Sequence, residues 1–232
     1  AITRLGVEIK LNTALGRDFT IDGLFTAGYQ AVYLAIGAHS SLKLEIPGED
    51  ADGVMTGVDF LRRANCGELT RLDGRVTIVG GGDVAIDAAR TAQRLGAGKV
   101  SILYRRSAQE MPARENEVAD ALAEGIEIEY LTAPHQILTQ NNRVIGVQAI
   151  RMELGAPDAS GRRRPVPISG SEFSIETDLV IPAIGQAPDS LCLTETAGLA
   201  LTRRGTIEVD DLTFATGREG IFAGGDAQTG PW

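Results

Sequence analysis

The sequence predicts an α/β fold built on a doubly wound parallel sheet, and three observations support this prediction. Short apolar runs that are typical of buried strands alternate with helical patterns between residues 75 and 131. A row of glycines, Gly80 to Gly82, joins the first of these runs to a helical pattern. From Gln136 the hydrophobic period changes to two, which adds an antiparallel section to the parallel sheet.

The clearest unit begins with a strand at Val76–Val79 and a helix at Val84–Leu95. A strand at Val100–Tyr104, a helix at Arg114–Glu124 and a strand at Ile126–Leu131 follow. This order of strand, helix, strand, helix and strand indicates a right-handed, doubly wound half-sheet. On the second helix we expect three residues to face the core: Val118, Ala121 and Leu122.

Further elements are expected on both sides of this unit. Before it, the pattern predicts strands at Gly6–Leu11 and Ala31–Ile36 with a short helix between them, and a helix at Asp59–Asn65. After it, a hairpin about Asn141 and Asn142 and a third strand within residues 163–176 predict a three-stranded antiparallel meander. The chain then returns to a buried parallel strand within Thr177–Asp189. Two short strands end it, within residues 205–216 and 220–226.

Composition narrows the function. The chain has 232 residues, 43% of them hydrophobic and 23% charged, with a formal net charge of -9, which argues against a nucleic-acid partner. No apolar run is long enough to cross a membrane and no leader pattern is present, so we expect a cytoplasmic protein. Cys66 and Cys192 lie far apart and form no CxxC pair or metal-ligand spacing, and His39 and His135 are equally isolated. No metal site and no catalytic side chain are expected.

The motif Gly80-Gly81-Gly82-Asp83-Val84-Ala85 fits the dinucleotide pattern G-x-G-x-x-A between a strand and a helix. Gly80 would allow a tight turn, Gly82 would let the backbone approach a pyrophosphate, and Ala85 would let helix and strand pack closely. The amides and positive dipole end of the helix would face the phosphates. The alternative is a structural glycine turn that binds nothing.

The next strand ends in Tyr104-Arg105-Arg106, where a dinucleotide fold that binds NAD would carry a carboxylate for the ribose. Guanidinium groups suit a 2′-phosphate, because their planar forks pair with its oxygens. The sequence therefore favours NADP(H) over NAD(H), although exposed loop arginines remain the alternative. The basic run Arg162–Arg164 is interpreted as a solvated hairpin tip without a binding role.

Together with these motifs, "IPAIGQAPD" and "GIFAGGDAQTGP" resemble the small (β) subunit of NADPH-dependent glutamate synthase and its relatives over essentially the whole chain. The relatives include NADPH:ferredoxin oxidoreductase subunits and the front half of dihydropyrimidine dehydrogenase. The resemblance implies a Rossmann-like, FAD/NAD(P)-binding fold of the glutathione-reductase type. It also implies an enzyme that passes hydride from NADPH to FAD and electrons on to iron–sulfur clusters.

The resemblance further implies an order of domains. Residues 1–38 and 188–232 would be parts of an FAD-binding domain, and residues 39–187 would be the NADPH-binding domain inserted into it. Tyr33–Ala38 and Ile181–Gln186 would be the two crossovers. The cofactor contacts would then include Arg105, Arg106 and Arg114 at the 2′-phosphate, Ala183, Ile184 and Gly185 in the second crossover, and Gly225 and Asp226 at the FAD ribityl chain.

The chain departs from the family in lacking the cysteine-rich region and the first FAD fingerprint. We therefore expect a fragment that does not hold FAD alone, and an iron–sulfur or large glutamate-synthase-type subunit as its partner. Unpaired strands in the flanks would be poorly packed, rearranged, or covered by a second copy in a homo-oligomer. Two alternatives stay open: an NADP(H)-binding module without its own chemistry, and a structural or docking remnant with an empty glycine turn.

Overall fold

The structure, a computed structural model, describes residues 2–158, 161–194 and 196–231 and divides the chain into two compact units. Ser41–Gly185 form one unit, called here the inserted unit. Ala1–Ser40 and Gln186–Trp232 form the other, called the flanking unit. The predicted nucleotide site lies in the inserted unit.

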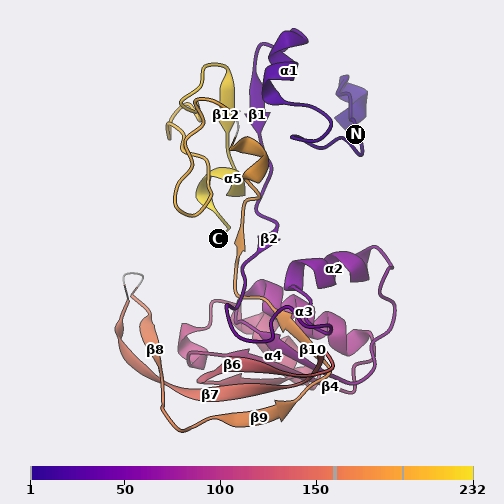
Figure 1. The fold of residues 1–232 in the computed structure, drawn as a ribbon, viewed down its shortest axis with the longest axis vertical. Coiled ribbons are helices and arrows are strands. Elements are labelled where there is room, and N and C mark those ends of the chain that lie inside the picture. The colour runs from indigo at the N-terminus through magenta and orange to yellow at the C-terminus, as the bar shows by residue number, and fades with distance from the viewer. Residues whose placement is uncertain (1, 159–160, 195, 232) are drawn as a thin grey trace. The chain divides into compact units, whose positions relative to one another are not determined.

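The inserted unit is built on a parallel sheet with the strand order β10-β3-β4-β5 (Figure 1). Its strands are β3 (Arg75–Val79), β4 (Lys99–Tyr104), β5 (Glu127–Tyr130) and β10 (Leu179–Pro182). All neighbouring pairs run parallel. Helix α3 (Asp83–Arg94) connects β3 to β4, and α4 (Glu115–Ala123) connects β4 to β5. The predicted unit of strand, helix, strand, helix and strand is therefore confirmed, with element bounds that differ by at most one residue.

Helices cover one face of this sheet. Helix α2 (Gly57–Asn65) packs with α3 and α4 there, and the core between them includes Phe60, Ile78, Ile86, Ala89 and Ile102. The predicted inward position of Leu122 is wrong, because its side chain is 51% exposed. On α4 the residues that face α3 are centred on Glu117, Ala121 and Glu124, where Arg90 of α3 pairs with both glutamates at 2.5 and 2.9 Å. Leu122 lies beyond the edge of that face.

An antiparallel sheet covers the other face. Strands β6 (Thr132–Gln140) and β7 (Arg143–Pro157) form the predicted hairpin, and Asn141 and Asn142 turn it with φ of 51° and 62°. The predicted third strand is divided into β8 (Arg163–Pro167) and β9 (Phe173–Glu176), because β7 is long enough to pair with both in turn. The core between the two sheets includes Val79, Leu103, Val180, Ile137 and Val147.

The flanking unit is smaller and has less regular structure. Helix α1 (Ile21–Thr26) and the parallel pair β1 (Val32–Leu34) and β12 (Ile221–Ala223) surround a core that includes Ile21, Leu34, Leu193, Ile207 and Ile221. Helix α5 (Asp226–Thr229) follows β12. Elsewhere, β2 (Ser40–Ser41) pairs with β11 (Gln186–Ala187), and 3-10 turns occur at Ile2–Leu5, Ala108–Glu110 and Leu191–Leu193.

Two predicted strands of the flanking unit are not formed. Residues 7–10 have no regular structure, and Val7, Ile9 and Leu11 are 48%, 55% and 77% exposed. A strand requires a hydrogen-bonded neighbour, and within the described residues none pairs with this segment. Residues 205–216 make only single bridges, because the Asp210 carboxylate accepts the amides of residues 212 and 213 and turns the chain.

None of the helices in the described part of the chain is both long enough and apolar enough to span a bilayer. Cys66 and Cys192 are free thiols, the first exposed and the second half-buried. Burial and the nearby Asp189 carboxylate raise the pKa of the Cys192 thiol.

One ion pair joins the start of β3 to the residue before β10, its neighbour in the parallel sheet, and its pH dependence tests the fold. The Asp178 carboxylate accepts the Arg75 backbone amide at 2.8 Å and its guanidinium at 3.1 Å. The guanidinium, followed by the amide, holds the pKa of Asp178 below its ordinary value. A lowered pKa in the folded state adds stability above the unfolded pKa of about 4, and this stability is lost as the pH falls. We expect Asp178→Asn to lower the free energy of unfolding by roughly 1 kcal/mol at pH 7 and to reduce its fall towards pH 3.

Urea unfolding at pH 7, 5 and 3.5 measures this effect. Asp73→Asn is the matched control, because Asp73 pairs with Arg71 at 2.9 Å on a surface where both side chains are mostly exposed. The control is expected to change stability by less than 0.5 kcal/mol at every pH, as is usual for exposed pairs. An Asp178→Asn variant with the wild-type acid dependence contradicts the prediction.

Candidate functional site

The turn between β3 and α3 is shaped by close contacts that only glycine permits. Gly80 has a φ of 148°, and its amide donates to the Leu103 carbonyl at 3.1 Å. A Cβ at Gly80 would lie 2.2 Å from the carbonyl oxygen of Ala183, which follows β10. The turn therefore fits between the ends of β4 and β10, and a side chain at this position would push them apart.

The second glycine of the turn lies against an aromatic ring. A Cβ at Gly81 would come within 2.4 Å of the Tyr104 ring, which is buried at the end of β4. The Tyr104 hydroxyl donates to the Glu110 carbonyl at 2.6 Å, and burial raises the pKa of this phenol, so it remains a donor. The Tyr104 ring thus packs under the glycine turn inside the protein. The sequence analysis had instead grouped Tyr104 with the residues that contact the ligand.

The third glycine faces open space. Gly82 is the N-cap of α3, and a Cβ there would meet nothing within 4 Å in the part of the chain that the structure describes. Because glycine has no side chain to cap the helix, the amides of residues 83 and 84 have no acceptor among the described residues. The Ala85 amide donates to the Gly82 carbonyl at 2.9 Å. Ala85 is fully buried and lets the helix pack against the turn. Asp83 and Val84 open the helix between them. The arrangement matches a site for a phosphate group.

The two arginines after β4 lie in different environments. Arg106 is only 6% exposed, and its guanidinium donates to the Asp158 carboxylate at 2.9 Å and to the Arg163 carbonyl at 2.8 Å. Arg105 is exposed, and no hydrogen bond or ion pair holds it among the described residues. Partial burial, followed by the Arg106 guanidinium, lowers the pKa of Arg105, with Arg162 acting in the same direction. The Arg105 guanidinium remains charged near neutral pH.

The loop from Ser107 to Arg114 closes onto the glycine turn. The Ala113 amide donates to the Gly81 carbonyl at 3.1 Å, and Arg114 then lies 3.7 Å from the Asp83 carboxylate. The side chain of Arg114 remains largely exposed, so its positive charge is placed beside the start of α3. Burial, followed by the Glu117 and Asp83 carboxylates, raises the pKa of Asp87, one turn further along the helix.

The remaining predicted contacts lie in two places. Ala183 follows β10, and its amide donates to the Val79 carbonyl at 2.8 Å, which holds the segment beside the glycine turn. Ile184 is 43% exposed, and Gly185 has a φ of 147°. The other two residues belong to the flanking unit, where Gly225 is the N-cap of α5 with a φ of 65° and the exposed Asp226 is its first residue.

The structure therefore gathers one group of predicted residues at the carboxyl edge of the parallel sheet: Gly80 to Ala85, Arg105, Arg114 and Ala183 to Gly185. Tyr104 and Arg106 support this group from within the protein. Sequence analysis did not identify Asp158 and the Arg163 carbonyl as the acceptors of Arg106. It also missed Glu110, which pairs with Arg163 and accepts the Tyr104 hydroxyl at its backbone carbonyl. Asp158 lies 52 positions from Arg106, and no sequence pattern links residues at that separation.

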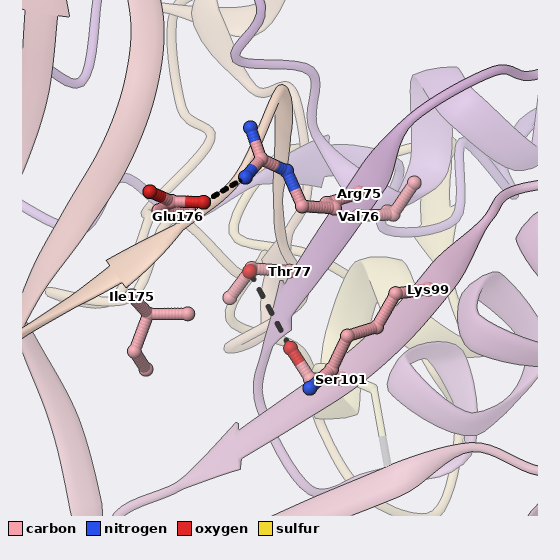
Figure 2. Close-up of a pocket in the computed structure, with 7 residues that line it drawn as sticks. All are labelled: Arg75, Val76, Thr77, Lys99, Ser101, Ile175 and Glu176. Atoms are coloured by element: carbon pink, nitrogen blue, oxygen red, sulfur yellow. Dashed lines mark hydrogen bonds and ion pairs between the residues drawn. The ribbon is translucent and has the colours of Figure 1, made fainter.

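A small hollow lies at the opposite edge of the sheet, where β3 and β4 begin. Figure 2 shows its lining, in which the Thr77 and Ser101 hydroxyls lie 3.4 Å apart between Arg75, Lys99 and Glu176. The volume is about 300 Å³. Both cations already pair with carboxylates, Arg75 with Glu176 and Asp178 and Lys99 with Glu127, so the hollow offers no free charge to an anion. It lies away from the glycine turn and forms no part of that site.

Two solved structures share this fold. FprA from Mycobacterium tuberculosis, solved in complex with NADPH, matches with a TM-score of 0.75 and 21% identity over 95% of this chain and 63% of its own. Thioredoxin reductase from T. acidophilum matches with a TM-score of 0.66 and 21% identity over 87% of this chain and 59% of its own. At this identity the likeness shows the fold alone.

Curated relatives are closer in sequence. The β subunit of an NADP(+)-dependent formate dehydrogenase from Moorella thermoacetica is 47% identical over 99% of this chain and 32% of its own length. The small chain of the NADPH glutamate synthase of Escherichia coli is 39% identical over 98% of this chain and 51% of its own length. The chain thus spans about a third to a half of these two proteins.

The resemblance inferred from the motifs is therefore confirmed, and it extends over the whole chain. The model of one protein family, described as pyridine nucleotide-disulphide oxidoreductase, matches residues 3–231. The parallel sheet, its glycine turn and the antiparallel sheet are the corresponding fold. The chain belongs to the pyridine nucleotide-disulphide oxidoreductase family.

Proposed function

We propose that the inserted unit binds NADP(H) at the glycine turn, with the pyrophosphate at the start of α3 and the 2′-phosphate at Arg105. One observation carries this proposal: an uncapped helix start at Gly82, open to solvent, lies one strand away from an exposed guanidinium at Arg105. Helix amides and dipole favour the pyrophosphate, while a guanidinium favours the additional phosphate of NADP(H). Arg114 adds positive charge beside the same helix.

For the complete protein we propose an NADPH-dependent flavin oxidoreductase that transfers hydride from NADPH to FAD. Electrons would then pass singly to iron–sulfur clusters in a partner subunit or another part of the protein. The support is the family together with relatives whose names describe them as NADP- or NADPH-dependent subunits. The residues of this chain would bind and orient the nicotinamide nucleotide, and the flavin supplies the redox chemistry.

The alternative is a module that binds NADP(H) and performs no chemistry alone. It is supported by the small parallel sheet of the flanking unit, where β1 and β12 form a two-stranded pair and Asp226 is exposed. If these elements belong to an FAD site, they would supply only part of it. We expect the purified chain to carry no flavin absorbance near 450 nm and to gain none when incubated with FAD. A yellow protein with stoichiometric flavin would contradict this expectation and would support a catalytically competent chain.

Arg105→Ala tests whether Arg105 recognises the 2′-phosphate. The loss of a charge-assisted contact is expected to weaken NADPH binding roughly 10- to 100-fold, corresponding to about 1.5–3 kcal/mol, and to change NADH binding less than twofold. Calorimetric titration of the chain with each nucleotide measures both. Arg203→Ala is the matched control, since it removes the same charge from an exposed position in the flanking unit. Equal losses for NADPH and NADH would show that Arg105 does not select between them.

The glycine turn offers a second test in which stability and binding separate. Gly82→Ala adds a methyl group in open space at an ordinary φ of −92°, so it should cost less than about 1 kcal/mol of stability while weakening both nucleotides at least tenfold. Gly80→Ala forces a Cβ onto the Ala183 carbonyl and should destabilise the chain by roughly 2 kcal/mol or more. Unfolding curves and nucleotide titrations measure the two effects. A Gly82→Ala chain that binds normally would place the ligand elsewhere.

A further inference from the structure

The end of the β7–β8 hairpin is fastened to the end of β4. The Arg106 guanidinium reaches both sides of the hairpin, with Asp158 after β7 and Arg163 at the start of β8 as its acceptors. Arg163 in turn pairs with the Glu110 carboxylate at 2.7 Å, in the loop that supports Tyr104. The hairpin end is closed by the Asp158 amide, which donates to the Arg162 carbonyl at 2.7 Å. The first three of these contacts hold a distant segment beside the proposed nucleotide site.

Burial makes the contact between Arg106 and Asp158 necessary. A guanidinium that is nearly inaccessible to solvent is strongly destabilising unless a carboxylate and further acceptors satisfy it. Asp158 supplies the charge and the Arg163 carbonyl supplies a second acceptor, so the fork of Arg106 is directed at the hairpin. The side chain next to it, Arg105, is exposed instead. Adjacent residues at a strand end point to opposite sides, which separates these two roles.

The hairpin brings positive charge towards Arg105. Arg162 directly precedes Arg163, whose carbonyl lies 2.8 Å from the Arg106 guanidinium. The charges of Arg106 and Arg163 have carboxylate partners in Asp158 and Glu110. Burial and then the Arg106 guanidinium lower the pKa of Arg105. The Arg162 charge acts in the same direction and the Asp158 carboxylate opposes it, so Arg105 and Arg162 repel each other. A phosphate dianion between them would relieve that repulsion.

We propose that the β7–β8 hairpin forms one wall of the 2′-phosphate pocket, in which Arg162 helps to select NADP(H) and Arg106 is the positioning residue that holds the hairpin in place. The proposal rests on the proposed binding of NADP(H) and deepens it. It revises the roles of the arginines: Arg105 and Arg162 act on the phosphate, whereas Arg106 acts through the hairpin. The basic run Arg162–Arg164, which the sequence analysis interpreted as a solvated hairpin tip, would then have a binding function.

The first test compares two neighbouring arginines of the hairpin. Arg162→Ala is expected to weaken NADP⁺ binding by about five- to tenfold, because one guanidinium that contacts the phosphate at the protein surface is lost. NAD⁺ binding should change less than twofold. Arg164→Ala removes the same charge two positions further along and is expected to change neither by more than twofold. Calorimetric titration of the full chain with NADP⁺ and with NAD⁺ measures all four constants. Equal effects of the two substitutions on NADP⁺ would overturn the role of Arg162.

The second test separates positioning by Arg106 from direct charge. Asp158→Asn removes the carboxylate that neutralises Arg106. If Arg106 acted on the phosphate by its own charge, this variant would bind NADP⁺ more tightly than the wild type. Positioning predicts the reverse, a loss of at least threefold for NADP⁺ with NAD⁺ unchanged, because the hairpin is released. Tighter binding by Asp158→Asn overturns the positioning role.

A double-mutant cycle provides the third measurement. If Arg106 acts through the hairpin, Arg106→Ala should already remove the contribution of Arg162 to NADP⁺ binding. The double variant should then bind NADP⁺ no more weakly than Arg106→Ala alone. Losses that simply multiply overturn the proposal. Circular dichroism establishes that each variant is folded, and if Arg106→Ala is not, the Arg162 and Arg164 comparison decides.

The outcome also distinguishes this proposal from the proposed function. A wild-type chain that binds neither NADP⁺ nor NAD⁺ below millimolar concentrations overturns both. A chain that binds NADP⁺ selectively but is indifferent to Arg162→Ala overturns only the role of the hairpin.

Discussion

The packing of the turn after β3 between two neighbouring strands is the constraint on which the rest of the site depends. Gly80 lies against the Ala183 carbonyl on one side, and Gly81 lies against the Tyr104 ring on the other. Because β3 lies between β10 and β4 in the sheet, both contacts are set at strand ends: Tyr104 is the last residue of β4, and Ala183 directly follows β10. The start of α3 is therefore held towards the open side, where Gly82 leaves room for a ligand. Such preorganisation lowers the ordering cost of binding.

The charges around this turn follow from burial. The chain is acidic, with a formal net charge of -9, and an anionic ligand therefore requires local positive charge. A buried cation must be paired, as Arg106 is with Asp158, and then contributes little field outside the protein. An exposed cation without such a partner, as Arg105 is within the described chain, keeps its field for a ligand. Two adjacent arginines in one motif thus serve two different purposes.

Sequence analysis predicted the inserted unit well because local signals agree there. Glycines, helical periodicity and continuous apolar strands all indicate the same unit, and Asn141 and Asn142 fix the hairpin. It failed at Gly6–Leu11, where an alternating pattern requires a neighbouring strand that the described chain does not provide. It could not separate Arg105 from Arg106, because burial of the second depends on Asp158, which only the tertiary structure brings near.

Under the proposed function, the division into two units would separate recognition of the nucleotide from hydride transfer. The turn, the end of β4 and the β7–β8 hairpin all belong to the inserted unit. The proposed selection between NADP(H) and NAD(H) would therefore depend on contacts within that unit. In the proposed function, hydride transfer would by contrast require a flavin site, to which the flanking unit would contribute. Relatives with different named activities share the segment that this chain covers, while much of their length lies outside it. If the inserted unit alone selects the nucleotide, it can stay the same in proteins whose electron-accepting domains differ. Its selectivity would not depend on those domains.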